Sequence, residues 1–367
     1  MAAPSQPQPV AYNAIVIGAG IQGSFAAYHL AQRHRDVLLL EQFILPHSRG
    51  SSHGQSRITR SAYTRALYAR MMPDSFRLWQ RLEAEAGTSL YRRTGLVVLG
   101  PAGDTELEGC RRSLGAGEIL DATVLARRFP GLRLHAGEVA VWDSTGGVLF
   151  ADRALRAVQV GAAKGTGWGP PAPSSQPPPV TIPTQDVFRR HGGTLRDGEK
   201  VLRIEPGAVL TITTTAGVYR APRLIIAAGA WTGALVAPLG LRLPLQVCYH
   251  HGSPADPEER DRVPPGTPRP AVALLSSFIS SYLPGLEPQP AVVETCLYTN
   301  TPDEDFILDR HPKFSNIIIG AGFSGHGFKL APVVGKLLCE LSLGEEPSHS
   351  TAPFAITRFP GVLRAAL

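Results

Sequence analysis

The segment from Ala14 to Glu41 constrains the fold of this chain more than any other. A short apolar run, residues 14–17, leads into the pattern G-x-G-x-x-G at Gly18, Gly20 and Gly23, and apolar residues at helical spacing follow it. A second apolar run, residues 37–40, ends on Glu41. This order predicts a dinucleotide-binding unit, with a pyrophosphate on the helix N-terminus and a carboxylate for the ribose hydroxyls. The alternative is a strand–turn–helix whose small residues serve packing alone, and the flanking strand and the acidic residue argue against it.

Length and composition fit a globular enzyme in a reducing compartment. The chain has 367 residues, 43% of them hydrophobic and 18% charged, which is enough for one large domain or two interleaved ones. No apolar run reaches membrane-spanning length, and the N-terminus lacks the features of a secretory signal, so we expect no membrane segment and no secretion. The four scattered cysteines predict neither a disulfide framework nor a metal site.

The formal net charge of +6 is not gathered into a basic block with interleaved aromatic residues. We therefore expect no nucleic-acid partner. Most of these basic side chains are read as solvated surface, and the remainder would favour an anionic cofactor and a carboxylate substrate.

A second glycine-rich loop, residues 320–329, follows the apolar run 316–319 and precedes a helix expected over 330–343. Its glycines allow the backbone to approach a flat ligand closely, and the helix N-terminus favours a negatively charged or electron-accepting group. His326 and Lys329 would be poor choices for a turn needed only for folding. The loop therefore predicts a ligand site.

The region between the two glycine loops is uneven. Residues 203–226 predict a strand meander that ends in a small-residue turn at Gly229, an arrangement typical of flavoproteins. Residues 152–160 predict a helix, and the proline-rich stretch 165–185 predicts a disordered surface insertion. A proline-rich ligand for a partner domain is the less favoured alternative for that stretch.

Three local patterns carry possible chemistry, each with a plainer alternative. Arg57 and Arg60 close a Gly/Ser-rich loop after Glu41; on a helical turn they would share one face, suited to a flavin edge and a carboxylate, or they belong to a solvated basic turn. Cys296, on a strand-like run from residue 291, would usually be a small core residue. His250, in a histidine pair, would usually be satisfied by backbone groups.

Several motifs, taken in order, resemble the monomeric sarcosine oxidase family over about residues 14–360: the Gly18 loop, residues 50–57, residues 296–303, residues 309–312 and the loop 320–329. The resemblance implies an α/β fold, with a Rossmann-type FAD-binding domain (12–90, 148–232 and 300–367) and an interleaved α+β substrate domain (91–147 and 233–299). Two departures are the insertion 165–185 and a deletion at Gln246, where relatives carry several dozen more residues. The deletion should truncate the large antiparallel sheet of the substrate domain, leaving unpaired edges and exposed apolar surface.

The resemblance implies a monomeric enzyme that oxidises secondary amino acids (sarcosine, L-pipecolate or proline) to the imine while O2 is reduced to H2O2. One alternative is a flavin-binding splice or gene-model variant with little turnover. Another is a nicotinamide dehydrogenase, which would share the Gly18 pattern but has no use for Cys296 or the 320–329 loop.

The resemblance also assigns roles to residues. Cys296 would carry FAD covalently through a thioether, Arg60 and Lys329 would hold the substrate carboxylate, and Arg57 would lie by the flavin. His250 and Tyr298 would shape the amine pocket, and Gln246 stands where the family has a lysine that activates dioxygen, which predicts slow flavin reoxidation. The predicted FAD contacts are Gly18, Gly20, Ile21, Gln22, Gly23, Glu41, Ser51, Ser52, Arg57, Val201, Gly229, Trp231, Cys296, Gly325, His326, Gly327 and Lys329.

The last three residues, Ala-Ala-Leu, resemble a weak form of the S-K-L peroxisomal address. Because the expected reaction makes hydrogen peroxide, we expect a peroxisomal location, or a cytoplasmic one if this signal is not read.

Overall fold

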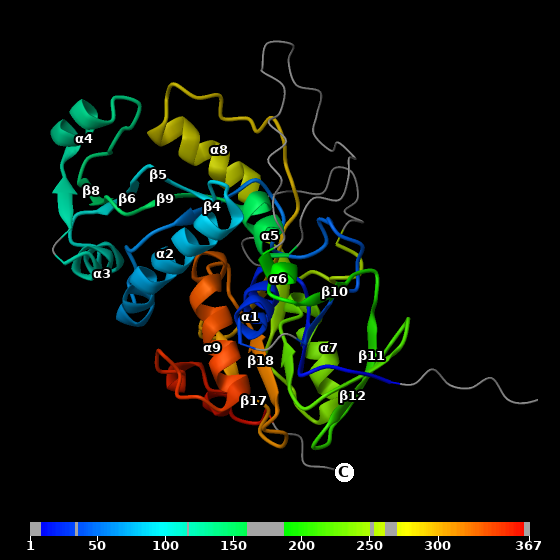
Figure 1. Cartoon of the computed structure of the whole chain (residues 1–367). Helices are drawn as coiled ribbons and strands as arrows, with labels where there is room; N and C mark the ends of the chain where they lie inside the picture. The colour runs from blue at the N-terminus through cyan, green and yellow to red at the C-terminus, as the bar shows by residue number, and fades with distance from the viewer. Residues whose placement is uncertain are drawn as a thin grey trace, which may run out of the picture.

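The computed structural model describes residues 9–33, 36–115, 117–159, 187–249, 253–260 and 270–362. Its centre is a six-stranded sheet in the order β10-β3-β2-β14-β18-β17 (Figure 1). The first five strands are parallel, and β17 runs antiparallel to β18. The bounds in sheet order are Thr194–Arg196, Val37–Leu40, Ala14–Ile17, Leu224–Ile226, Ile317–Ala321 and Ile307–Arg310.

Both faces of this sheet are buried, which explains the continuous apolar runs in its strands. In β2, Ala14 and Val16 belong to one core cluster and Ile15 and Ile17 to another, as the alternation of side chains along a strand requires. Helices α1 (Ile21–Ala31) and α9 (Ala331–Leu343) contribute to the first cluster. The two helices pack closely at Gly335, which has no side chain: a Cβ built there would lie 2.5 Å from the Cβ of Phe25.

The predicted strand meander covers the opposite face and is confirmed. It forms a four-stranded sheet in the order β1-β13-β12-β11, with bounds Val10–Ala11, Val218–Ala221, Leu210–Thr214 and Val201–Glu205. Leu210 and Ile212 join the second core cluster together with Leu38 of the central sheet. The chain then passes through a 3-10 turn, Gly229–Trp231, into α7 (Thr232–Val236) and a second turn, Ala237–Leu239.

The remaining elements lie beside this three-layer body (Figure 1). Two three-stranded sheets have the orders β4-β9-β5 and β6-β8-β7. Their bounds are Ser56–Thr59, Gly147–Phe150 and Tyr91–Arg93 for the first, and Leu96–Pro101, Glu138–Asp143 and Glu118–Leu120 for the second. The helices are α2 (Ala66–Ala86), α3 (Thr105–Ser113), α4 (Ala122–Arg128), α5 (Ala151–Gln159), α6 (Val187–Arg190) and α8 (Pro270–Tyr282). Helix α5 confirms the helix expected at 152–160, whereas the stretch 165–185 lies outside the described residues.

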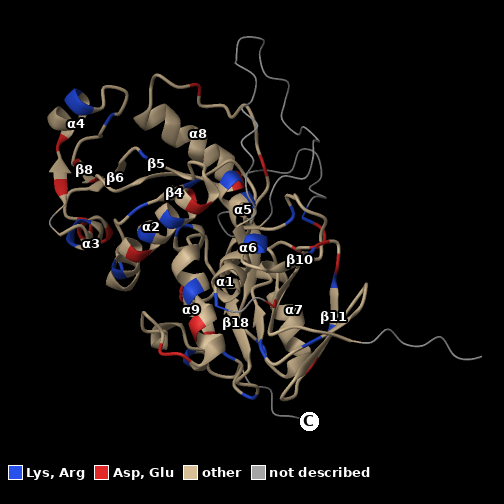
Figure 2. Cartoon of the chain, in the orientation of Figure 1, with Lys and Arg blue, Asp and Glu red and all other residues tan. Residues whose placement is uncertain are grey.

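Basic and acidic residues are spread over many elements, including α2, α5, α6 and α9 (Figure 2). No helix among the described residues is long and apolar enough to span a bilayer.

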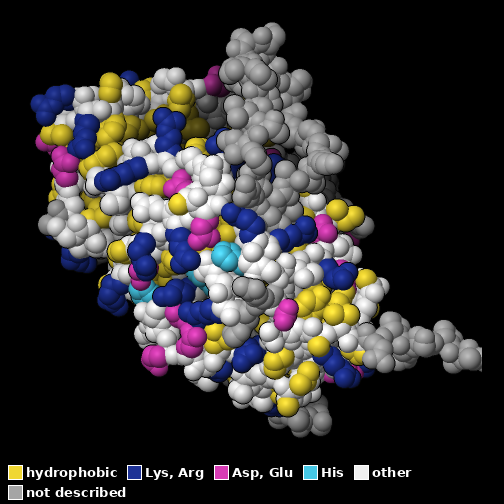
Figure 3. All heavy atoms as spheres, in the orientation of Figure 1, with side chains coloured by type: hydrophobic (Ala, Val, Ile, Leu, Met, Phe, Trp, Pro, Cys, Tyr) yellow, Lys and Arg dark blue, Asp and Glu magenta, His cyan; other side chains and the backbone are white. Residues whose placement is uncertain are grey.

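The strands β15 (Gln246–Tyr249) and β16 (Leu297–Asn300) form a separate two-stranded sheet. Nearby in sequence, α8 exposes Leu274, Leu275 and Phe278, and hydrophobic side chains are visible on that part of the surface (Figure 3). The short sheet and the exposed apolar residues match the expectation for a shortened substrate domain.

Candidate functional site

The glycine loop at the carboxyl end of β2 has the close approaches that a dinucleotide site requires. Gly18 has φ of +100°, and a Cβ there would lie 2.6 Å from the carbonyl oxygen of Ala227, just after β14. A Cβ at Gly23 would lie 1.9 Å from the carbonyl oxygen of Gly18, so α1 and its preceding turn touch directly. By contrast, nothing lies within 4 Å of a Cβ built on Gly229. In open α/β sheets the ligand lies at such carboxyl ends, where the strand order reverses.

Glu41 and Ser52 lie beside this loop. Glu41, at the end of β3, is 7% exposed and accepts hydrogen bonds from the backbone N–H of Ala19 at 2.9 Å and of Phe43 at 3.2 Å. The Ser52 hydroxyl accepts from the backbone N–H of Ile21 at 3.0 Å, at the first turn of α1. A carboxylate and a helix N-terminus therefore face the same loop, which fits the ribose and pyrophosphate of a dinucleotide.

The second glycine loop lies against the first. The Gln22 side-chain amide of α1 donates to the carbonyl oxygen of Gly327 at 2.9 Å, while its Oε1 is buried without a hydrogen-bond partner among the described residues. Gly325, with φ of +79°, leaves room for the Tyr298 ring, which a Cβ would meet at 2.4 Å. The hydrogen bond between Gln22 and Gly327 brings together two loops that are about 300 positions apart in the sequence.

Lys329 and Arg60 approach the same aromatic ring. Lys329 Nζ lies 5.6 Å from the centre of the Tyr63 ring, and the Arg60 guanidinium carbon lies 5.1 Å from it. Burial, with a smaller contribution from the Arg60 charge, lowers the pKa of Lys329 to about 7. Within the described part of the chain, neither cation has a carboxylate partner, and the buried Tyr63 hydroxyl has no hydrogen-bond partner.

His326 lies in the aromatic neighbourhood of this pair. Its ring packs edge-on against Tyr68 with centroids 4.7 Å apart, and its Nε2 lies 3.2 Å from the carbonyl oxygen of Glu304. Burial, followed by the Lys329 charge, lowers the pKa of His326 to about 4. The imidazole is therefore neutral at physiological pH.

The Arg57 side chain binds backbone carbonyl groups of the loop 51–56. Its Nη2 donates to the carbonyl oxygens of Ser51 at 2.9 Å and His53 at 2.6 Å, and its guanidinium lies 5.4 Å from the Phe328 ring centre. The expected helical turn is wrong, because residues 56–59 form strand β4, which pairs with β9. Arg57 lies within β4 and Arg60 directly follows it.

Cys296 lies at the same loop. Its Sγ is 3.7 Å from the Ser51 carbonyl oxygen, and burial raises the pKa of the thiol although Arg57 and Arg260 oppose this effect. The strand-like run expected from residue 291 is wrong: β16 begins at Leu297, because β15 pairs only with residues 297–300. Burial also raises the pKa of Tyr298, two residues further on.

The other sequence-predicted residues are distributed around these loops. Val201 begins β11, next to Glu199 and Lys200, and the Trp231 ring packs edge-on against Phe43 with centroids 5.4 Å apart. Gln246 is exposed and pairs with Asn300 across the short sheet. His250 lies outside the described residues.

The described residues fit an FAD. A Cβ on Gly229 would meet nothing within 4 Å, Glu41 and the α1 N-terminus suit the nucleotide part, and the Cys296 thiol lies at the loop 51–56. Among the described residues, no cluster of His, Cys, Asp and Glu could hold a metal ion.

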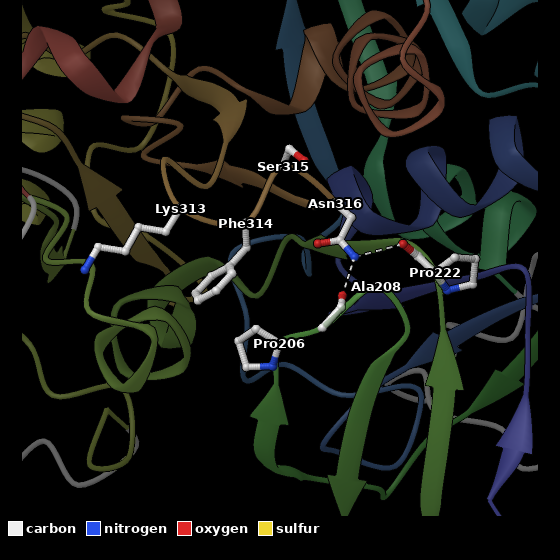
Figure 4. A pocket seen from close by; sticks show the side chains of 8 residues that line it. Pro206, Ala208, Pro222, Lys313, Phe314, Ser315 and Asn316 are labelled. Atoms are coloured by element: carbon white, nitrogen blue, oxygen red, sulfur yellow. Dashed lines mark hydrogen bonds between the residues drawn. The ribbon is translucent and has the colours of Figure 1, made fainter.

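Two surface hollows lie away from these loops. One, of about 460 Å³, is lined by residues 206–208, Pro222 and 313–316 near the amino ends of β14 and β18, where Asn316 Nδ2 donates to the carbonyl oxygens of Gly207 and Pro222 at 3.0 and 3.1 Å (Figure 4). The other, of about 350 Å³, lies beside Trp142 and Asp143. Neither contains a residue of the candidate site.

Two residues of this region escaped sequence reasoning. The ring centre of Tyr63 lies within 5.6 Å of both cations, and its only sequence signal is an aromatic residue three positions after Arg60. Arg260 is buried against the segment that carries Cys296, and no local pattern distinguishes it from the other arginines of the chain.

Comparison with known proteins identifies the family of this chain. Residues 13–167 and 251–341 match the family described as FAD dependent oxidoreductase. The peroxisomal sarcosine oxidase of Homo sapiens is 46% identical over 409 aligned positions, covering 97% of this chain and 98% of that protein. The chain belongs to the FAD dependent oxidoreductase family, and within it to the sarcosine oxidases.

More distant sarcosine oxidases agree with this assignment. A monomeric sarcosine oxidase of Bacillus sp. (strain NS-129) is 28% identical and covers 95% of this chain and 97% of its own length. Among solved structures, a Tyr258Phe mutant of NikD, described as an unusual amino acid oxidase, superposes with a TM-score of 0.75 at 23% identity, covering 95% of this chain and 97% of that one. This superposition supports the fold. The alignment with the human protein is 409 positions long, whereas this chain has 367 residues. The human protein therefore carries residues that this chain lacks.

Proposed function

We propose that this sarcosine oxidase relative oxidises small secondary amino acids, with sarcosine, L-pipecolate and proline as the candidate substrates. The observation that carries the proposal is the pairing of buried Lys329 with half-buried Arg60, which both approach the Tyr63 ring beside the two glycine loops. Two cations brought together without a carboxylate partner favour a bound anion, and a substrate carboxylate supplies one. The names of the relatives, sarcosine oxidases, support a secondary amine next to that carboxylate.

In this proposal the chain binds and orients the substrate. Lys329 and Arg60 hold the carboxylate, the Tyr63 hydroxyl gains a hydrogen-bond partner, and Tyr298 with His250 bounds the amine side. The redox chemistry would be supplied by a bound FAD: oxidation at the carbon beside the amine, with dioxygen reduced to hydrogen peroxide. The neutral His326 and its aromatic neighbours keep water from Lys329, which strengthens its interaction with the carboxylate.

We also propose that FAD is attached covalently to Cys296. Support comes from the placement of its thiol at the Ser51 carbonyl, beside Arg57, where no disulfide or metal uses it. The remaining predicted contacts (Gly18, Gly20, Ile21, Gln22, Gly23, Glu41, Ser51, Ser52, Val201, Gly229, Trp231, Gly325, His326 and Gly327) would hold the same cofactor without a covalent bond. After acid precipitation the wild-type protein should stay yellow, and Cys296→Ala should release its flavin. A wild-type flavin that is released by acid would contradict attachment.

The domain division expected from the sequence, with FAD-binding segments 12–90, 148–232 and 300–367, remains part of the proposal, as do a monomeric state and a peroxisomal location. The names of the relatives support the last two. No comparison favours the alternative of a variant without turnover.

Hydrogen peroxide formation tests the proposed reaction. We expect peroxide with at least one of sarcosine, L-pipecolate and proline, and far less with glycine, which lacks the secondary amine. Arg60→Met should raise KM much more than it lowers kcat, because its cation binds the carboxylate in the ground state and the transition state alike. A preference for glycine, or for amines without a carboxylate, would contradict the proposal.

A further inference from the structure

Arg260 joins two segments that meet at Cys296. Its side chain is 2% exposed. Its Nη1 donates to the carbonyl oxygens of Arg49 at 2.6 Å and Gly50 at 3.3 Å, and its Nη2 donates to that of Thr295 at 2.8 Å. Thr295 precedes Cys296, while Arg49 and Gly50 precede Ser51, whose carbonyl the Cys296 thiol approaches. One guanidinium therefore binds both backbone segments that meet at the thiol, the one before Ser51 and the one before Cys296.

The segment that carries Arg260 is itself anchored to the FAD-binding body. Glu258 Oε1 accepts from the Trp231 indole at 2.9 Å and lies 3.6 Å from Lys200 Nζ. The Glu258 carbonyl accepts from Arg49 at 3.3 Å. Tyr249, at the end of β15, donates through its hydroxyl to the Arg260 carbonyl at 3.3 Å. These contacts tie the segment 258–260 to the loop at Arg49, to Trp231 and to β15.

The charge of Arg260 also acts on the thiol. Burial raises the pKa of Cys296, and the positive charges of Arg57 and Arg260 oppose that rise. Among the described residues, the titratable groups around Cys296 and Arg260 include Tyr298 and Cys248, His53 with Glu294, and Tyr249 with Glu258. A thiolate is the reactive form of cysteine, so a nearby cation increases its reactivity at neutral pH.

We propose that Arg260 is a positioning residue for flavin attachment: it holds the segment that leads into Cys296 against the loop 49–51, beside Arg57. The inference rests on the proposed attachment of FAD to Cys296. In the net reaction the thiol loses its S–H hydrogen and the flavin methyl group one C–H hydrogen as the S–C bond forms. The two electrons reduce the flavin ring, and dioxygen takes them up as hydrogen peroxide.

The experiment follows attachment directly. Apoprotein is mixed with FAD in air, and the acid-stable flavin is measured over time in wild type, Arg260→Gln, Arg260→Lys and Arg112→Gln, whose arginine is exposed on α3. We expect attachment at least tenfold slower in Arg260→Gln, partial recovery in Arg260→Lys and no change in Arg112→Gln. Non-covalent FAD binding, measured by flavin fluorescence quenching, should persist in all four proteins.

A second readout separates charge from folding. The pH profile of Cys296 alkylation by iodoacetamide in apoprotein, followed by mass spectrometry, should have its midpoint shifted upward in Arg260→Gln and less so in Arg260→Lys. Attachment at the wild-type rate together with an unshifted midpoint in Arg260→Gln would overturn the inference. A wild-type protein that never forms acid-stable flavin would instead overturn the attachment itself, and the inference with it.

Discussion

Replacement of Lys329 by methionine should greatly weaken the binding of small carboxylates. The lysine is buried, and its ammonium group and the Arg60 guanidinium both lie near the Tyr63 ring. Removal of one partner from a buried charge pair costs about 2–5 kcal/mol, which corresponds to a loss of affinity of roughly 30- to several-thousand-fold. The fold should tolerate the change, since methionine keeps the volume of the lysine stem and leaves no buried charge.

Because the pKa of Lys329 is lowered, carboxylate binding should be coupled to the uptake of a proton. The difference between the ordinary lysine value of 10.5 and about 7 corresponds to about 5 kcal/mol against the charged form. In the free protein Lys329 is therefore largely neutral above pH 7, and a bound carboxylate would draw a proton onto it. Affinity should fall by up to about tenfold per pH unit above pH 7.

The same shift makes stability depend on pH. Because the folded-state pKa of Lys329 lies below its unfolded value, the unfolded state binds more protons between about pH 7 and 10.5. The free energy of unfolding contributed by this residue therefore rises with pH across that window, and this contribution should vanish in Lys329→Met.

Calorimetric titration of the holoprotein with acetate, in two buffers of different ionisation enthalpy, measures affinity and proton uptake together. At pH 8 we expect uptake of nearly one proton in wild type and in Lys313→Met, whose lysine is exposed. We expect little or no uptake, and much weaker binding, in Lys329→Met. Equal acetate affinity in Lys329→Met and wild type would refute the assignment of a carboxylate to this pair.

Three further changes test other parts of the site. Gln246→Lys should speed reoxidation of reduced flavin by tenfold or more in stopped-flow mixing with oxygenated buffer, since a cation stabilises superoxide; an unchanged rate would remove Gln246 from the oxygen site. Tyr63→Phe should stabilise the ligand-free protein by about 1 kcal/mol in thermal unfolding, because it removes a buried hydroxyl without a partner, and a loss of stability would show that the hydroxyl is satisfied. Gly23→Ala should abolish FAD binding, since its Cβ would lie 1.9 Å from the Gly18 carbonyl, whereas Gly131→Ala, with nothing within 4 Å and no positive φ, should bind FAD normally.

Local sequence patterns were sufficient for the cofactor side of the molecule. The Gly18 turn, the strand before it and the carboxylate after β3 lie within one short segment, so their spacing alone fixes their arrangement. The meander and the second glycine loop were also predictable, because alternating apolar residues and glycine turns specify them locally.

The substrate side depends on long-range packing. Lys329 and Arg60 are about 270 positions apart, and no sequence pattern shows that both approach the Tyr63 ring. The start of β16 at Leu297 depends on how much of β15 remains to pair with it. The position of Arg260 follows from tertiary contacts with Arg49 and Thr295, so it became visible only in the folded structure.

Anaerobic reduction of the bound flavin by substrate tests the proposed function most directly. The purified yellow protein is mixed with sarcosine, and separately with L-pipecolate, in the absence of oxygen, and its visible absorbance is followed before and after air is admitted. We expect the flavin absorbance to bleach with at least one substrate and to return in air with formation of hydrogen peroxide. A flavin that binds fully but is bleached by neither amino acid, nor by proline, would contradict the proposal that this chain oxidises secondary amino acids.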